Sequence, residues 1–124
     1  MNYSFMTFST PELTLEDVLD LAKKIGYDGI EPRIVSQHKH GIEIETGDDE
    51  RTGIRRKVES SGVRLACIAT SCRFADPDTT DENVDIAQKS IDLAADTGAP
   101  AIRVFGGKLG EGLTREKATE LVAN

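Results

Sequence analysis

The stretch Lys24-Ile25-Gly26-Tyr27-Asp28-Gly29-Ile30-Glu31 decides the fold, because two later stretches repeat its pattern. They are Ser61-Gly62-Val63-Arg64-Leu65-Ala66-Cys67 and Thr97-Gly98-Ala99-Pro100-Ala101-Ile102-Arg103-Val104. In each stretch a helix-like run ends at a glycine, and a short apolar run follows. A glycine just beyond the last helical turn supplies the left-handed residue that ends many helices. Gly26, Gly62 and Gly98 are evenly spaced, 36 residues apart, so the sequence predicts a repeated helix, glycine and strand unit.

Apolar residues at helical spacing predict four helices. One follows the candidate N-cap Thr14, two cover roughly residues 49–61 and 81–97, and the last begins after Thr114. The apolar positions that define them are Leu15, Val18, Leu19, Ala22 and Ile25; Ile54 and Val58; Val84, Ala87, Ile91 and Ala94; and Ala118, Leu121 and Val122. Short apolar runs between them predict strands at roughly 2–8, 28–33, 63–70 and 101–106. Alternating strands and helices favour a parallel sheet of right-handed βαβ units.

Two parallel folds of this kind compete, a flavodoxin-like domain and a (β/α)₈ barrel. Glu31 and Arg33 share one face of their strand while Ile30 points to the other, and Arg103 and Phe105 are likewise opposite Ile102 and Val104. One polar face and one aliphatic face fit a barrel, because helices cover only its outer face. Four units fill the 124 residues, about half of an eight-stranded barrel, and a fifth would begin near position 134. We therefore expect one α/β domain over residues 1–124, a parallel (βα)₄ half of a TIM barrel.

The net charge, the lengths of the apolar stretches and the cysteines each disfavour particular classes of function. The formal net charge of −7 disfavours a broad nucleic-acid-binding or anionic membrane surface. No apolar stretch reaches the roughly 20 residues of a membrane span, and the N-terminus lacks a signal-peptide pattern, so we expect a cytoplasmic protein. Cys67 and Cys72 match neither a disulfide framework nor a zinc site.

Polar side chains gather where the predicted strands end, which is where parallel α/β folds carry function. The candidate substrate-binding residues are Glu31, Arg33, His38, His40, Ser71, Arg73 and Arg103. Glu31 and Arg33 bind polar groups or form a structural ion pair. The two histidines contact substrate or lie in an exposed loop. Arg73 and Arg103 form a clamp for a carboxylate or phosphate, or pair with Glu31, Asp76 or Asp78.

Two further signals are weaker. Two histidines are too few for a zinc site, so we expect no metal site in this chain. The glycine-rich residues 106–112 match neither a phosphate-binding P-loop nor a dinucleotide fingerprint, and a flexible linker is the preferred interpretation. We assign no catalytic residue.

The three repeated stretches, in this order and spacing, resemble the sugar phosphate isomerase/epimerase family, whose members are xylose isomerase-like (β/α)₈ barrels. The resemblance covers essentially the whole chain and extends through His38-Lys39-His40-Gly41 and Ser71-Cys72-Arg73-Phe74. It implies proton transfer beside a carbonyl, assisted by a divalent metal (Mn, Mg, Co or Zn). The family's metal ligands, typically Glu, Asp, His and Glu, follow strands five to eight. Glu31 is the residue most readily carried over to a substrate-binding role.

From this resemblance we expect the N-terminal half of a metal-dependent sugar (phosphate) isomerase or epimerase, inactive alone. The alternative is a non-catalytic half-barrel that binds a small polyol or anion. Open sheet edges invite association, so we expect a homo-oligomer, such as a dimer, or pairing with a complementary half-barrel. A small sugar or polyol is the expected ligand, with neither nucleic acid nor membrane as partner.

Overall fold

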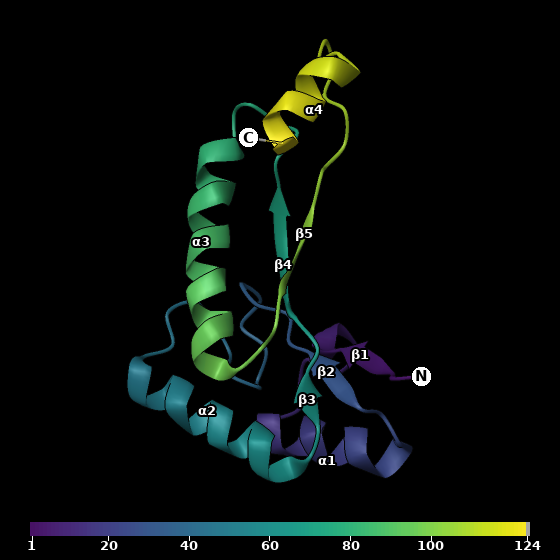
Figure 1. Ribbon diagram of the computed structural model, residues 1–124, viewed down its shortest axis with the longest axis vertical. Coiled ribbons are helices and arrows are strands. Elements are labelled where there is room, and N and C mark those ends of the chain that lie inside the picture. The colour runs from purple at the N-terminus through teal and green to yellow at the C-terminus, as the bar shows by residue number, and fades with distance from the viewer. Residues whose placement is uncertain (124) are drawn as a thin grey trace.

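Strands and helices alternate along residues 1–123, which the computed structural model describes, except that two consecutive strands precede the third helix (Figure 1). Every strand pairing is parallel. The elements are β1 (Ser4–Met6), a 3-10 turn (Thr7–Ser9), α1 (Leu15–Ile25), β2 (Gly29–Glu31), α2 (Asp48–Ser61), β3 (Arg64–Leu65), β4 (Ile68–Arg73), α3 (Thr80–Thr97), β5 (Ile102–Phe105) and α4 (Arg115–Ala123). The predicted α/β class and parallel pairing are confirmed.

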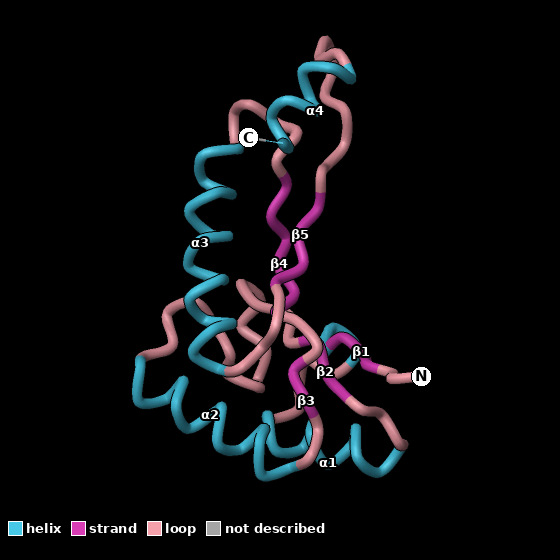
Figure 2. The backbone as a smooth tube through the Cα atoms, in the orientation of Figure 1, coloured by secondary structure: helices cyan, strands magenta, loops and turns pink. Residues whose placement is uncertain are grey.

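The strand expected at 63–70 is divided into β3 and β4. The strands are ordered β1-β2-β3 and β4-β5 (Figure 2). A parallel bridge between Arg33 and Ala69 joins the two parts. The Ala69 N–H donates to the Pro32 carbonyl at 2.8 Å, so this segment still follows β2. Pro32 has no N–H to donate in return, which interrupts the ladder at Ala66 and Cys67. The sheet therefore has four strand positions, and the third is broken in two.

Helices α1, α2 and α3 form one row on one side of the sheet, which distinguishes a barrel half from a doubly wound sheet. Helix α1 contacts α2, α2 contacts α3, and α3 packs on β4 and β5. Between helices and sheet lies a core of fully buried side chains, including Val18, Ala22, Ile30, Ile34, Ile42, Ile68 and Leu93. The predicted (βα)₄ half of a TIM barrel is confirmed.

The helix ends follow the predicted signals. The Thr14 hydroxyl accepts a hydrogen bond from the Asp17 N–H at 3.3 Å, as an N-cap does. Gly26, Gly62 and Gly98 end α1, α2 and α3 with φ of 81°, 77° and 86°. The left-handed region strongly favours glycine, so the evenly spaced glycines do mark the repeat.

Helix α3 is rotated from the expected orientation. The sequence pattern places Val84 and Ile91 in the core, yet they are 40% and 54% exposed. Ser90 and Thr97 are buried instead, and their hydroxyls donate to the Ile86 and Leu93 carbonyls of the same helix. Because these bonds satisfy the hydroxyls internally, small polar residues can face the sheet and bring α3 close to it.

Helix α4 does not cover β5. In Figure 1 it lies beyond the ends of the strands, whereas α3 runs along them. Val104, expected under a helix, is 39% exposed, and Phe105 is 41% exposed. The outer edge of β5 and the flank of α3 that carries Val84 and Ile91 are therefore open within residues 1–123. Across the same residues, the helices are too short or too polar to span a bilayer.

Candidate functional site

Side chains from several strands meet on the polar face of the sheet, opposite Ile30. The register pairs Met6 with Glu31, so β1 and β2 present these side chains side by side. The Ser4 hydroxyl donates to Glu31 Oε1 at 2.6 Å, and Arg103 Nη2 lies 2.9 Å from Met6 Sδ. We call Ser4, Met6, Glu31, Cys67 and Arg103 the inner cluster.

The pKa of the Cys67 thiol depends on the charges of the inner cluster. Burial raises the pKa of its thiol most, and the negative charge of Glu31 and a hydrogen bond with it raise the pKa further. The positive charge of Arg103 lowers the pKa and only partly offsets these effects. Cys67 is therefore a protonated thiol near neutral pH, which does not act as a nucleophile.

Arg103 brings an unneutralised positive charge into the inner cluster. Its guanidinium carbon lies 5.0 Å from the centre of the Phe105 ring. Its Nε is buried without a hydrogen-bond partner, and it forms no ion pair within residues 1–123. A planar guanidinium with a free donor is suited to bind a carboxylate or phosphate.

Glu31 and Arg33 do not form the ion pair considered from the sequence. The Arg33 N–H donates to the Thr7 hydroxyl at 2.9 Å, and its Nη1 donates to the Thr70 carbonyl at 3.2 Å. The Thr70 hydroxyl in turn donates to the Arg103 carbonyl at 2.7 Å. Arg33 therefore ties β2 to β4 and, through Thr70, to β5, while Glu31 remains in the inner cluster.

His38 and His40 lie together in the β2–α2 connection but make different contacts. The Ile42 N–H donates to His40 Nδ1 at 3.1 Å, so Nε2 carries the proton and donates to the Arg33 carbonyl at 3.1 Å. Burial lowers the pKa of His40, which keeps the ring neutral. Both nitrogens of His40 thus serve the loop itself, which argues against the predicted substrate contact.

His38 is the histidine with a free ring nitrogen. The two rings meet edge to face, with their centroids 5.6 Å apart. His38 Nδ1 is buried and has no hydrogen-bond partner among the described residues. An unsatisfied buried nitrogen is rare in folded proteins, and the described residues supply no partner for it.

Ser71 and Arg73 lie elsewhere, in a groove of about 820 Å³ between the β4–α3 connection and residues 107–113. Both are exposed, and Arg73 forms no ion pair with Asp76, Asp78 or any other described residue. The register places Ala69 beside Arg103 and Arg73 beside Phe105, with an irregularity between. The two arginines of the predicted clamp therefore sit at different levels of the sheet.

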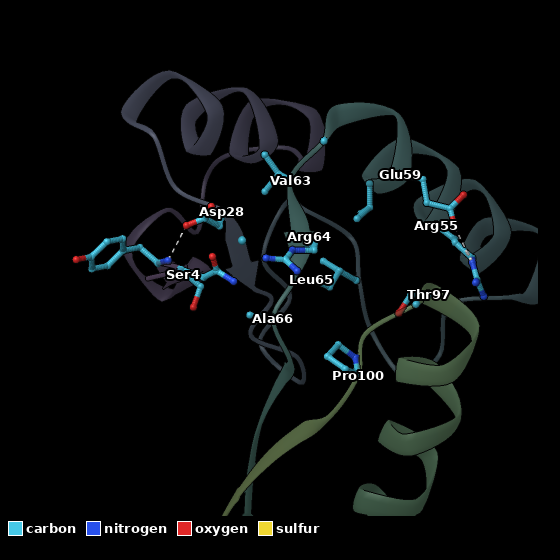
Figure 3. A pocket seen from close by; sticks show the side chains of 16 residues that line it. Ser4, Asp28, Arg55, Glu59, Val63, Arg64, Leu65, Ala66, Thr97 and Pro100 are labelled. Atoms are coloured by element: carbon cyan, nitrogen blue, oxygen red, sulfur yellow. Dashed lines mark hydrogen bonds and ion pairs between the residues drawn. The ribbon is translucent and has the colours of Figure 1, made fainter.

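A second pocket of about 670 Å³ opens at the amino ends of the strands (Figure 3). Its polar groups pair locally: the Tyr3 N–H donates to Asp28 Oδ2 at 2.8 Å, and Arg55 pairs with Glu59 at 3.0 Å. Parallel barrels carry their chemistry at the carboxyl ends of the strands, so we place the candidate site there.

Several members of the site could not be identified from sequence reasoning. Ser4 and Met6 alternate along a strand that is correctly predicted, but nothing in the sequence shows that β1 pairs with Glu31. Thr70 links three strands through hydrogen bonds that depend on the irregular register. Only period-two alternation, applied to the first strand, singles out Ser4 and Met6.

The described residues do not form a set of ligands for the metal that the resemblance to the family implies. Within residues 1–123, no three His, Cys, Asp or Glu side chains are grouped so that they could bind one ion. The inner cluster offers one carboxylate beside a protonated thiol and a guanidinium, which does not suit a divalent cation.

Comparison with known proteins finds solved structures that align with this chain. Among solved structures, a probable 3-DHS dehydratase AsbF from Bacillus anthracis, involved in petrobactin synthesis, aligns with a TM-score of 0.73 and 17% identity. A xylose isomerase domain protein from Planctomyces limnophilus aligns with a TM-score of 0.65 and 16% identity. Each alignment covers 99% of this chain and 45% of the other.

A fusion of a xylose isomerase-like TIM barrel with a 4-hydroxyphenylpyruvate dioxygenase aligns with a TM-score of 0.66 and 21% identity, over 99% of this chain and 18% of that one. The chain thus spans less than half the length of these structures. No curated protein matches it. A model of the xylose isomerase-like TIM barrel family matches residues 19–124. The chain belongs to the xylose isomerase-like TIM barrel family.

Proposed function

We propose that this chain forms the substrate-binding, N-terminal half of the mouth of a sugar (phosphate) isomerase or epimerase. The ligand is a small polyol that carries an anionic group. The observation that carries the proposal is Arg103, whose guanidinium lies among Met6, Phe105 and Cys67 without a carboxylate partner within residues 1–123. This charge suits a phosphate or carboxylate, and Glu31 beside it suits hydroxyl groups.

The remaining candidates lie in two other places. Ser71 and Arg73 line the separate groove at the end of β4, and the His38 ring lies in the β2–α2 connection with a buried Nδ1 that has no partner among the described residues. Arg33 and His40 hold the strand ends and the loop in place through backbone carbonyls. We propose that these groups bind and orient the polyol so that the carbon beside its carbonyl faces the open side of the sheet.

Proton transfer itself is not assigned to a residue of this chain. Cys67 is protonated, and Glu31 accepts a hydrogen bond from Ser4. A divalent metal would act as a Lewis acid in the family's reaction, but the donors within residues 1–123 do not fit one. We propose that the complementary half of the barrel, or a second copy, supplies the rest of the site.

A binding module without turnover is the second candidate, because the chain spans only 45% of two related structures. A titration followed by a complementation step separates the two candidates. The chain is titrated with D-ribulose 5-phosphate in ²H₂O, while amide shifts and loss of the proton beside the carbonyl are followed by NMR.

Shifts at Glu31, His38 and Arg103 are the expected result. Deuterium exchange in this mixture favours the isomerase, and shifts without exchange favour either an incomplete enzyme or a binding module. A complementary half-barrel that restores exchange then identifies the incomplete enzyme. Shifts confined to other surfaces, or none at millimolar ligand, contradict both candidates.

A further inference from the structure

The connection between β2 and α2 contains two residues in an unusual backbone conformation. Val35 and Gln37 have φ of 54° and 55°, in the left-handed region that side chains rarely adopt. A β-branched residue such as Val35 is especially disfavoured there. The Val35 side chain is also 55% exposed, so burial of the side chain does not hold it in this conformation. Such outliers persist where the surroundings enforce them, often beside a functional site.

The enforcing group is the carboxylate of Glu43. It accepts hydrogen bonds from three successive backbone N–H groups: Val35, Ser36 at 3.2 Å and Gln37 at 2.9 Å. Successive N–H groups that converge in this way form a nest, a concavity that binds anions. In this protein an internal side chain supplies the anion.

Glu43 is itself anchored to the helices. Its N–H donates to the Thr46 hydroxyl at 3.0 Å. Arg51 of α2 donates to the Thr46 carbonyl at 2.7 Å and to the Ile44 carbonyl at 2.8 Å, and it pairs with Asp96 of α3 at 2.8 Å. The nest is therefore connected through Glu43 to two helices of the rigid scaffold.

His38 directly follows the nest. On its other side, the Lys39 N–H donates to the Pro11 carbonyl at 3.0 Å, and Lys39 pairs with Glu12 at 3.0 Å. The loop is thus held at both ends, by the nest and by the connection that follows β1. Between these anchors lies the buried Nδ1 of His38, which has no partner among the described residues.

We propose that Glu43 is a positioning residue, and that its carboxylate, bound in the nest of residues 35–37, fixes the loop so that the His38 ring is held in one orientation for the ligand. This inference rests on the proposed function for the identity of the ligand. The loop geometry does not depend on that identity, so the two can fail separately.

The test removes the carboxylate and returns it from solution. In Glu43→Ala the amides of residues 35–37 should exchange about tenfold faster, and the ¹⁵N signals of the His38 ring should move. Acetate should restore both readouts in part, whereas chloride at equal ionic strength should not, because only acetate matches the missing group. Glu45→Ala is the matched control, since Glu45 is exposed and the nest's three N–H groups donate to Glu43 instead. Unchanged exchange and unchanged His38 signals in Glu43→Ala overturn the proposal.

A second variant keeps the test decisive if Glu43→Ala fails to fold. Glycine adopts positive φ readily, so Val35→Gly combined with Glu43→Ala should fold while the His38 signals stay displaced. Signals at their wild-type positions in this double variant overturn the proposal. Titration with D-ribulose 5-phosphate then tests the link to function: Glu43→Ala should bind about tenfold more weakly than Glu45→Ala. If the wild-type chain does not bind the sugar phosphate, the proposed function fails while the exchange and acetate results still judge the positioning role.

Discussion

Arg103 contacts an aromatic face and a thioether sulfur, and its buried Nε has no partner among the described residues. Its positive charge and that of Arg33 share the polar face of the sheet with only one cluster carboxylate, Glu31. Since leaving a buried donor unsatisfied costs free energy, an anionic ligand at Arg103 would offset that cost. This balance is the reason we propose the polar face as a binding surface.

The thiol of Cys67 offers a chemical probe of this arrangement. Glu31→Gln removes a negative charge that raises the pKa of Cys67. The thiolate fraction at pH 8 should then rise, and alkylation of Cys67 by iodoacetamide should accelerate about three- to tenfold. Mass spectrometry separates Cys67 from the buried Cys72, and Glu45→Gln serves as the control. An unchanged rate in Glu31→Gln would show that Glu31 does not face Cys67.

The lowered pKa of His40 should make the free energy of unfolding depend on pH. Burial, then the neighbouring His38, lowers the pKa of His40 in the folded chain below its ordinary value of 6.5. The unfolded chain therefore binds a proton at higher pH than the folded chain. The stabilising contribution is present above pH 6.5 and is lost as the pH falls through the folded pKa.

Thermal unfolding between pH 7.5 and 5 measures this effect. The wild-type Tm should fall on acidification. His40→Asn should be less stable at pH 7.5 but should lose less of its Tm over the same range, whereas His38→Asn should keep most of the wild-type slope. Equal slopes for wild type and His40→Asn would contradict the assignment.

The members of the candidate site and their contacts could be predicted from the sequence only in part. Glu31 and Arg103 are recognisable because a charged residue inside an apolar strand must face a polar region of the fold. Their partners Ser4 and Met6 are not recognisable from the sequence, because pairing between strands is a tertiary property. The hydrogen bonds of His40 to Arg33 and Ile42 could not be predicted for the same reason, because they depend on the path of the loop, which the local sequence does not encode.

At the level of elements, the helix ends were the most predictable features. The left-handed glycines act locally, so spacing alone located them. The broken third strand followed from Pro32 on the neighbouring strand and could not be seen in its own residues. The orientation of α3 was missed because Ser90 and Thr97 satisfy their hydroxyls within the helix, which hides a buried face from a hydrophobicity pattern.

A glycine inside α2 and the glycine that ends this helix give opposite predictions for the same substitution. Gly62 has φ of 77° with open space where a Cβ would lie, so Gly62→Ala should lower the free energy of unfolding by about 1 kcal/mol through backbone strain alone. Gly53 lies inside the helix with ordinary φ and equal space, so Gly53→Ala should raise it by about 0.5–1 kcal/mol. Urea unfolding measures both. A stabilising Gly62→Ala would contradict the left-handed helix end.

At the scale of the whole molecule, the half-barrel exposes the edge of β5 and the apolar side chains around it. Val104 and Phe105 are 39% and 41% exposed, and Ile91, Leu109 and Val122 are more exposed still. An unpaired parallel strand beside such side chains favours association. The pattern of four units predicted an open sheet edge, but it did not predict that α4 would leave β5 uncovered.

Light scattering after size exclusion tests association. The chain should elute as a species heavier than its 13.5 kDa monomer. Val104→Lys at the β5 edge should shift the population toward monomer, and Ser60→Lys, which adds the same charge to the outer face of α2, should not. A wild-type chain that stays monomeric at millimolar concentration would contradict the prediction.

We propose that Arg103 makes the polar face of the half-barrel an anion-binding surface for a polyol. The most direct measurement compares the affinities of D-ribulose 5-phosphate and uncharged D-ribulose in wild type, Arg103→Gln and Arg56→Gln, the last removing an exposed charge from the outer face of α2. Wild type and Arg56→Gln should prefer the phosphate at least about tenfold, and Arg103→Gln should lose that preference, as expected for one charge-assisted interaction. A preference that survives in Arg103→Gln, or one lost equally in Arg56→Gln, would contradict the account.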